Sequence, residues 1–463
     1  ISYRQSPAGQ KHFGMSPYDA ESFWFRPYLD DEVCWTGTNN GAWDEYQQRQ
    51  YPSFDGWNSI SEQTMADDNP DNDLTPSGVK KLFTWEHRLN GAIHSPDVNI
   101  DAGFGGPVPF ISSRFGNLRF FLSTLHEQDM YLYEVSSPGL YRQSYLLKLT
   151  SDLSDNSKLV YSFYNGNMEG TTLSRGGGTS IMNDVWDLAS QVNSSGFTMP
   201  WRLYTNEYWA PTEVKNSTHG LKYTRFINND AFFDLLLKID SKDYITGHGA
   251  RRDTLTTYPI FGAGDDLWIA DEAPVGFFGG PLFSVEGRLA FGGAISTSRD
   301  SSTVRTVTFK GNYTRQLNNN HQLKTGGELV LSKLDLKYGS QNEFLPSGNY
   351  WSLMDVNPYR LSFFVQDKLE YKGFVAIAGL NLDVLNPNSE WYVIDNYDDD
   401  FFSSNYTAAA EETFETIGLD PQLQLSPRLA LSHPITETSK LYFNYGHYQQ
   451  MPIAQDLYRV RRG

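Results

Sequence analysis

The sequence predicts an all-β protein, a transmembrane antiparallel up-and-down β-barrel with long loops at one end. Three observations carry this prediction. Apolar and polar residues alternate along short segments, the segments come in pairs joined by tight turns, and the connections between pairs are long and rich in aromatic and acidic residues. Short turns at one end and long loops at the other are typical of membrane-spanning barrels.

The clearest pair of strands runs from Arg360 to Asp383 and turns at Tyr371-Lys372-Gly373. Side chains point to opposite faces of a strand in turn, so apolar residues at every second position form one apolar face. Five residues of the second strand share such a face: Phe374, Ala376, Ala378, Leu380 and Leu382. The opposite face is mixed, with Asn381 and Asp383 beside Val375 and Ile377.

The same pattern predicts about thirteen strands along the chain. Their expected ranges are 1–7, 98–103, 118–125, 142–150, 158–164, 222–228, 231–240, 303–315, 321–337, 360–371, 374–383, 428–435 and 440–447. The long connections are 8–97, 165–221, 241–302, 338–359 and 386–427. An open sheet leaves two unpaired edges, which lipid does not tolerate, and single-chain bacterial barrels have even strand numbers. We therefore expect either that further strands follow residue 463 or that the protein is not a membrane barrel.

Composition excludes several classes of protein. Hydrophobic residues make up 39% of the chain, which is too much for bulk disorder, and the net charge of −18 argues against a nucleic-acid binder. No apolar run reaches the length of a membrane-spanning helix, and Cys34 is the single cysteine, so no intrachain disulfide can form. The aromatic content of 15% fits the aromatic girdles of a barrel, and equally a β-rich surface domain such as a lectin.

The insertion at 8–97 is rich in aromatic residues and shows no clear periodicity. Long loops of this kind are usually functional, so we expect an extracellular loop that binds ligand. Aromatic rings offer a large rigid surface for sugars or peptides. The alternative is that they pack the loop onto itself. The candidate ligand-binding residues are Trp24, Trp35, Trp43, Tyr46 and Trp57.

Two acidic clusters are candidates for calcium sites, because calcium takes six to eight oxygen ligands. One cluster comprises Asp67, Asp68, Asp71 and Asp73, and the other comprises Asp395, Asp398, Asp399 and Asp400. Neither has the spacing of an EF-hand loop. The alternative for each is a solvated acidic loop, and no other cofactor is indicated.

No enzyme motif stands out. His126-Glu127 lacks the second histidine of a zinc protease, and the glycines after Arg175 lack the lysine of a phosphate-binding loop. Asp44 and Glu45 could form the carboxylate pair of a glycosidase, but adjacent carboxylates in a loop are usually solvated. The sequence therefore predicts a protein that is not an enzyme.

Three segments resemble the TonB-dependent outer-membrane receptors. GGPVPFISSRFGNLRFFLS at 105–123 resembles their first periplasmic turn, and 360–383 and 426–452 resemble their barrel strands. The segments look closest to large receptors of the Bacteroidetes–Ignavibacteria type. The resemblance extends over most of the chain, and its loops are not diagnostic of a substrate.

The resemblance implies a partial receptor barrel over 1–463, taken from a barrel of about 22 strands, with the plug before residue 1 and the C-terminal strands after residue 463 absent. It implies an outer-membrane protein of a Gram-negative-type bacterium that binds a ligand at the cell surface and imports it by TonB-coupled gating. The implied partners are outer-membrane lipid, the TonB complex through an N-terminal region outside this chain, and a surface lipoprotein. The alternatives are a surface adhesin or carbohydrate-binding protein without transport, and then a soluble glycoside hydrolase.

Overall fold

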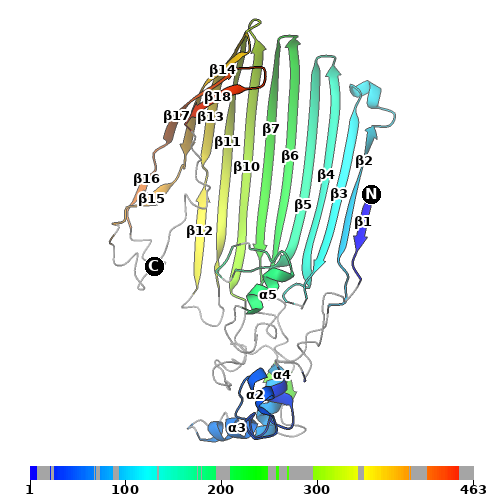
Figure 1. Ribbon diagram of the computed structural model, residues 1–463, viewed down its shortest axis with the longest axis vertical. Coiled ribbons are helices and arrows are strands. Elements are labelled where there is room, and N and C mark those ends of the chain that lie inside the picture. The colour runs from blue at the N-terminus through cyan, green and yellow to red at the C-terminus, as the bar shows by residue number, and fades with distance from the viewer. Residues whose placement is uncertain are drawn as a thin grey trace.

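The computed structural model is dominated by one large antiparallel sheet (Figure 1). It describes residues 1–7, 21, 25–66, 68, 73–86, 93–132, 135–174, 176–178, 180–193, 209–248, 257–259, 268–270, 296–341, 349–395, 397 and 414–447. The sheet has 14 strands, in the order β1-β2-β3-β4-β5-β6-β7-β10-β11-β13-β14-β17-β18, with β12 pairing β11. Strands that are neighbours in the chain are neighbours in this sheet, which confirms the predicted all-β, up-and-down architecture.

The strands of the sheet are long in its centre and short at its edges. Their bounds are Ser2–Gln5 (β1), Val98–Pro107 (β2), Arg119–Met130 (β3), Gly139–Ser154 (β4), Ser157–Thr171 (β5), Pro211–Asn228 (β6), Ala231–Thr246 (β7), Ser298–Gln316 (β10), His321–Ser340 (β11), Tyr350–Val356 (β12), Tyr359–Tyr371 (β13), Phe374–Asn386 (β14), Gln422–Pro434 (β17) and Lys440–Gly446 (β18).

Connections are sorted by length between the two ends of the sheet, as predicted. The short hairpin turns and the connection from β2 to β3, which contains the 3-10 helix η2 (Ser112–Phe115), lie at the end that is uppermost in Figure 1. The turn between β13 and β14 is made by Lys372 and Gly373, which have φ of 49° and 83°. Positive φ at both central residues defines the type I′ hairpin turn, whose twist matches that of its strands. The turn therefore has two residues rather than the three expected.

Strand β12 corrects the prediction that 338–359 is a loop. It pairs with residues 334–340 of β11, towards the long loops, and β13 pairs with residues 321–331, towards the short turns. β12 and β13 therefore follow one another along the same edge of β11. The break falls at Asn357 and Pro358, where the amide of Ser332 donates to the Pro358 carbonyl over 3.0 Å. Proline has no N–H for the ladder, so the strand is interrupted there. A small cluster of Leu334, Val356 and partly buried neighbours, Trp391 among them, packs beside the break.

Several central strands are also longer than predicted. Strand β6 starts at Pro211 instead of residue 222, and β10 starts at Ser298 instead of residue 303. Alternating hydrophobicity marks only the part of a strand that has one apolar face. The polar ends of these strands pair through their backbones and carry no such pattern.

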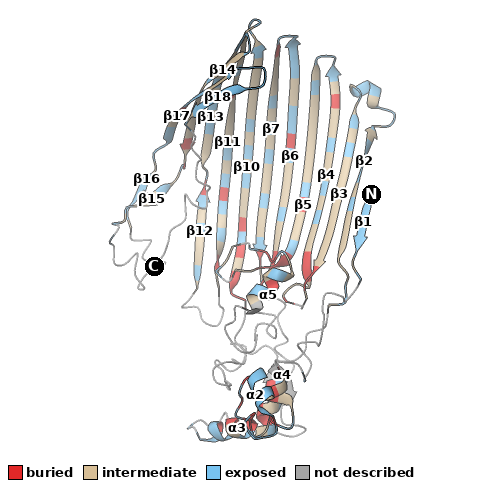
Figure 2. Cartoon of the chain, viewed as in Figure 1, coloured by how far each residue is buried: buried red, intermediate tan, exposed pale blue. Residues whose placement is uncertain are grey.

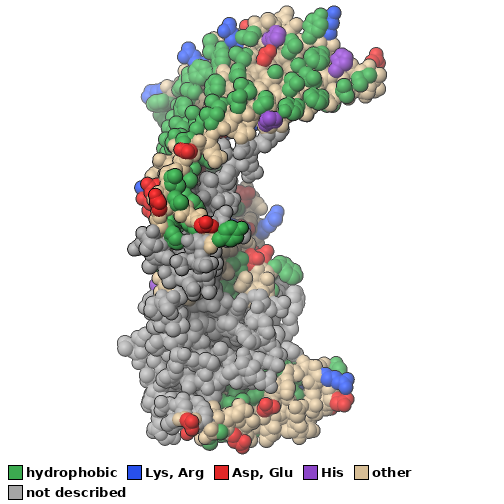
Figure 3. Space-filling view, turned by 90° about the vertical axis from the view of Figure 1, so that its left-hand side faces the viewer, with side chains coloured by type: hydrophobic (Ala, Val, Ile, Leu, Met, Phe, Trp, Pro, Cys, Tyr) green, Lys and Arg blue, Asp and Glu red, His purple; other side chains and the backbone are tan. Residues whose placement is uncertain are grey.

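The register gives the sheet one apolar face, because residues directly opposite one another on paired strands point to the same side. One row of this face is apolar from β3 to β17: Phe120, Leu149, Tyr161, Leu221, Leu237, Phe309, Leu329, Leu361, Val384 and Leu423. Many of these side chains are open to the surroundings, with Leu237 at 40% and Phe309 at 50% exposure. In the space-filling view hydrophobic side chains gather over the strands in the upper half (Figure 3).

The opposite face, called the polar face below, carries charged and hydroxyl side chains. Its members include Lys148, Ser162, Thr218, Lys238, Asp240, Thr308, Lys310, Asn312, Glu328, Arg360, Ser362, Asn381 and Asp383. Apolar residues such as Val375 and Ile377 share this face, as expected from the sequence. The predicted division of 374–383 into one apolar and one mixed face is confirmed.

The insertion at 8–97, whose sequence shows no clear periodicity, contains regular structure. Its described part contains four helices: α1 (Arg26–Leu29), α2 (Glu45–Gln50), α3 (Trp57–Met65) and α4 (Pro76–Glu86). Asp44 caps α2, accepting from the amide of Gln47 over 2.8 Å, so its carboxylate has a structural role. Gly56 precedes α3 with φ of 89°, and a Cβ there would lie 2.6 Å from the Trp35 carbonyl oxygen.

These four helices, called the helical unit below, have an aromatic core of their own. The buried residues Phe25, Tyr28, Phe54, Trp57 and Phe83 contact one another, with ring centroids 4.8 to 6.3 Å apart. Figure 2 shows that buried residues gather in this unit and at the long-loop end of the strands, while the middle of the sheet is mostly half-buried or exposed. Tertiary packing thus stabilises these helices, which are too short for a helical period of apolar residues to be recognised in the sequence.

The remaining elements are a helix and two small hairpins. Helix α5 (Val185–Asn193) lies at the long-loop end, β15 (Glu390–Tyr392) pairs β16 (Thr416–Gly418), and β8 (Thr257–Pro259) pairs β9 (Trp268–Ala270). Among the described residues, the helices are all too short or too polar to cross a membrane.

The helical unit should depend on Trp57, which is fully buried and donates from Nε1 to the Tyr28 carbonyl over 2.8 Å. Trp57→Ala should cost about 3–5 kcal/mol of local stability, because it leaves a cavity and an unpaired carbonyl. Hydrogen exchange over residues 25–86 should then accelerate. Tyr46→Ala is the control, since Tyr46 is 69% exposed, and it should leave exchange unchanged. Equal protection in the two variants would contradict the proposed core.

Candidate functional site

The centre of the polar face holds a three-residue ion network on adjacent strands. Glu328 of β11 accepts from Lys310 of β10 over 3.1 Å and from Arg360 of β13 over 2.6 Å. Glu328 is directly opposite Lys310 in the ladder, and on its other side Arg360 of β13 is opposite Val330, two residues further along the same face. Each oxygen of the carboxylate therefore has its own cation, and the network joins three strands.

Other polar residues of this face are paired too, some across neighbouring strands and some along one strand. Asp240 accepts from Thr218 over 2.7 Å and pairs with Lys238 at 2.9 Å. Asn312 donates to Asp234 over 3.0 Å, and Asn381 donates to Asp383. Charged groups that bond to one another while remaining partly accessible suit a wall that lines a wet interior.

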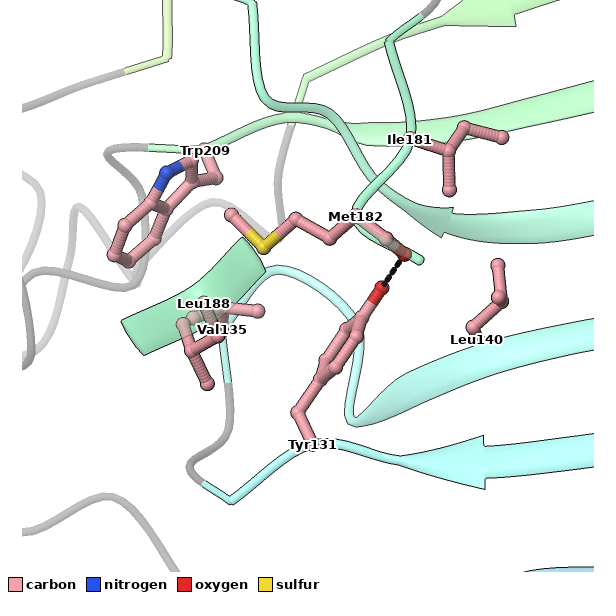
Figure 4. Close-up of a cluster of buried hydrophobic side chains, with 7 residues drawn as sticks. All are labelled: Tyr131, Val135, Leu140, Ile181, Met182, Leu188 and Trp209. Carbon is pink, nitrogen blue, oxygen red and sulfur yellow. Dashed lines mark hydrogen bonds between the residues drawn. The ribbon is translucent and has the colours of Figure 1, made fainter. Parts of the chain in front are cut away.

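Long loops pack onto the ends of β3 to β6 and form a second buried cluster (Figure 4). Its members are Tyr131, Val135, Leu140, Ile181, Met182, Leu188 and Trp209. The Tyr131 hydroxyl donates to the Met182 carbonyl over 2.8 Å, and burial raises the pKa of this phenol. The described residues around this cluster thus pack against the ends of β3 to β6.

The predicted ligand-binding aromatics fall into different environments. Trp43 and Trp57 are buried in the helical unit, Trp35 is half-buried, and Tyr46 is exposed. Trp24 lies outside the described residues. Burial of two indoles fits the alternative that these rings pack the insertion onto itself. Trp35 and Tyr46 are the ones with accessible surface, and the ligand-binding role of the set stays a prediction.

Trp35 belongs to a charged cluster on the helical unit. The Lys80 ammonium lies 4.6 Å from the Trp35 ring centroid, 2.9 Å from Asp31 and 3.3 Å from the Cys34 sulfur. Burial lowers the pKa of Lys80, but the hydrogen bonds to Asp31 and Cys34 raise it more, and the net shift is upward. Burial raises the pKa of the Cys34 thiol. Lys80 is therefore a fixed cation that ties α4 to the segment after α1.

The predicted calcium ligands are only partly described. Asp68, Asp73 and Asp395 are exposed, while Asp67, Asp71, Asp398, Asp399 and Asp400 lie outside the described residues. Within the described part of the chain, no group of three or more His, Cys, Asp or Glu side chains is arranged to hold a metal ion. The calcium sites therefore stay a prediction.

Sequence reasoning missed the ion network of the polar face. The signal was present, because Glu328 and Lys310 lie on strands whose pairing could be aligned from their turn. It also missed a pocket of about 320 Å³ at the long-loop end of β1 to β3, lined by residues such as Arg4, Asp97 and Glu127. This pocket forms where the loops meet the sheet edge, which the sequence pattern does not specify.

Comparisons with known proteins give structural neighbours only. No protein-family model and no curated protein matches the sequence. The FrpB iron transporter of Neisseria meningitidis (F3-3 variant) is similar over 77% of this chain and 45% of its own, at 13% identity and a TM-score of 0.45. The alcaligin outer membrane receptor FauA of Bordetella pertussis is similar over 76% of this chain and 41% of its own, at 10% identity and a TM-score of 0.43.

The ferric yersiniabactin uptake receptor FyuA of Yersinia pestis is similar over 75% of this chain and 44% of its own, at 10% identity and a TM-score of 0.42. The chain thus spans less than half the length of each of these three proteins.

Proposed function

We propose that the sheet is part of the wall of an outer-membrane β-barrel, and that the protein is a receptor that binds a ligand outside the cell and imports it. The observation that carries the proposal is the row from Phe120 to Leu423, which runs from β3 to β17 with an aliphatic or aromatic side chain at every position. A soluble protein would have to cover this face, whereas lipid solvates it.

The height of the apolar face supports the same proposal. On β10 the face is bounded by Arg305 towards the long loops and by Arg315 towards the short turns. The strand rises about 3.3 Å per residue, so these two arginines are about 33 Å apart along it. A tilt of about 40° would reduce this to about 25 Å, the height of the apolar band in outer-membrane barrels.

The remaining features fit roles in transport. The paired charges around Glu328 would line the path inside the barrel, and the packed loops and the helical unit would meet the ligand outside. Import would be binding and gating without bond chemistry, with energy from a TonB complex. Trp35 and Tyr46 are the accessible aromatic candidates for ligand contact. A surface lipoprotein remains a proposed partner, as does outer-membrane lipid.

Which face of the sheet meets lipid can be tested by substitutions at the middle of the apolar band. Leu361 is on the apolar face, opposite Leu329, whereas Ser362 is on the polar face, opposite Glu328 and Asp383. Leu361→Arg should cost about 2–4 kcal/mol, because it places a charge in lipid. Ser362→Arg should be tolerated beside two carboxylates. Urea unfolding in lipid bilayers measures both, and equal stability of the two variants would contradict the membrane assignment.

Orientation can be tested with epitope tags in whole cells. We expect a tag after Asp68, in the helical unit, to be stained by antibody on intact cells, because long loops face outwards in such barrels. A tag after Glu437, in the short turn between β17 and β18, should be stained only after permeabilisation. The reverse pattern would invert the topology, and staining of both tags on intact cells would exclude a membrane-spanning sheet.

A further inference from the structure

The long-loop boundary of the apolar face is a single row of polar side chains in register. The row runs across β4, β5, β6, β7, β10 and β11 through Tyr145, Asn165, Ser217, Ser241, Arg305 and Lys333. The next apolar-face row towards the turns is apolar except at His219 and consists of Leu147, Phe163, His219, Ile239, Val307 and Leu331. In a membrane this change from polar to apolar side chains would lie at the level of the lipid headgroups.

Arg305 and Lys333 are the charged members of this row and lie directly opposite one another. Both side chains are exposed on the apolar side of the sheet. Like charges directly opposite on paired strands destabilise a sheet, so an anion beside the two cations would relieve their repulsion.

Protein carboxylates do not supply that anion in the part of the chain that the structure describes. Neither Arg305 nor Lys333 has an ion pair there. Asp335 and Asp243 lie in the next row of this face towards the loops, where Asp243 accepts from Thr303 over 2.9 Å. By contrast, Lys310 and Arg360 on the polar face both form ion pairs with Glu328.

We propose that Arg305 and Lys333 bind the phosphate of an anionic membrane lipid whose acyl chains lie on Val307 and Leu331. The guanidinium fork matches two phosphate oxygens, and the ammonium adds a second positive charge. A free phosphate would satisfy the charge alone, but the apolar side chains immediately below favour a lipid. The inference rests on the proposed membrane function and assigns a lipid contact to particular residues.

The test measures lipid binding to the purified protein in detergent micelles by native mass spectrometry. Dioleoyl phosphatidylglycerol is the anionic probe, and dioleoyl phosphatidylcholine is the zwitterionic one. The double variant Arg305→Gln with Lys333→Gln should bind phosphatidylglycerol about thirtyfold more weakly, since each cation near a membrane surface contributes about fivefold. Lys333→Arg should retain binding.

The matched control is Lys222→Gln with Lys324→Gln, two exposed lysines of the polar face, which should bind phosphatidylglycerol like the unaltered protein. Phosphatidylcholine binding should be the same in all variants. Equal affinity of the unaltered protein and the Arg305/Lys333 double variant would overturn the site. If inorganic phosphate at equal concentration displaced phosphatidylglycerol, the site would bind free phosphate, and the proposal of a lipid ligand would be wrong.

Failure of the proposed function would look different. A protein that stays in solution without detergent and does not float with phosphatidylcholine vesicles would contradict the membrane wall itself. A protein that floats with vesicles, but whose double variant binds phosphatidylglycerol normally, would contradict only the lipid site.

Discussion

Strand register is the constraint on which the rest of this structure depends. The side-chain period of a strand is two, so a slip of one residue would exchange the apolar and the polar face of that strand. The row from Phe120 to Leu423 and the network around Glu328 exist together because every intervening pair keeps its register. The irregularities recorded in the ladders, at Asp152/Ser154 and Phe226/Asn228, lie next to turns, where they do not disturb either face.

Side-chain contacts across β11 reinforce this register. Gly326 and Gly327 are directly opposite Phe364 and Phe363 of β13. A Cβ on Gly326 would lie 2.8 Å from the Phe364 ring, so the ring occupies the space that the glycine leaves on the polar face. An aromatic side chain that covers a strand glycine favours one pairing over its neighbours. The pairing of β11 with β13 is thereby fixed next to Glu328, on its side towards the turns.

The sequence pattern was sufficient for the sheet and insufficient for what lies outside it. Alternation and turn residues identified thirteen strands and the sorting of their connections, because both are local properties of the chain. The helical unit was missed, since its helices are short and are stabilised by rings that come together from Phe25 to Phe83. Strand β12 was missed because Pro358 interrupts the pattern on which the prediction relied. The ion network needed the register between strands, which alternation alone does not give.

The break between β12 and β13 gives the sheet a fork. On one side of it β14 continues the ladder from β13, and within the described residues β12 pairs only with β11. Trp391 of β15 packs against the cluster of Leu334 and Val356 at this point. Within the described residues, the loop end of the sheet beyond β12 is therefore held by contacts between apolar side chains, whereas the turn end continues as a backbone ladder through β14 and β17.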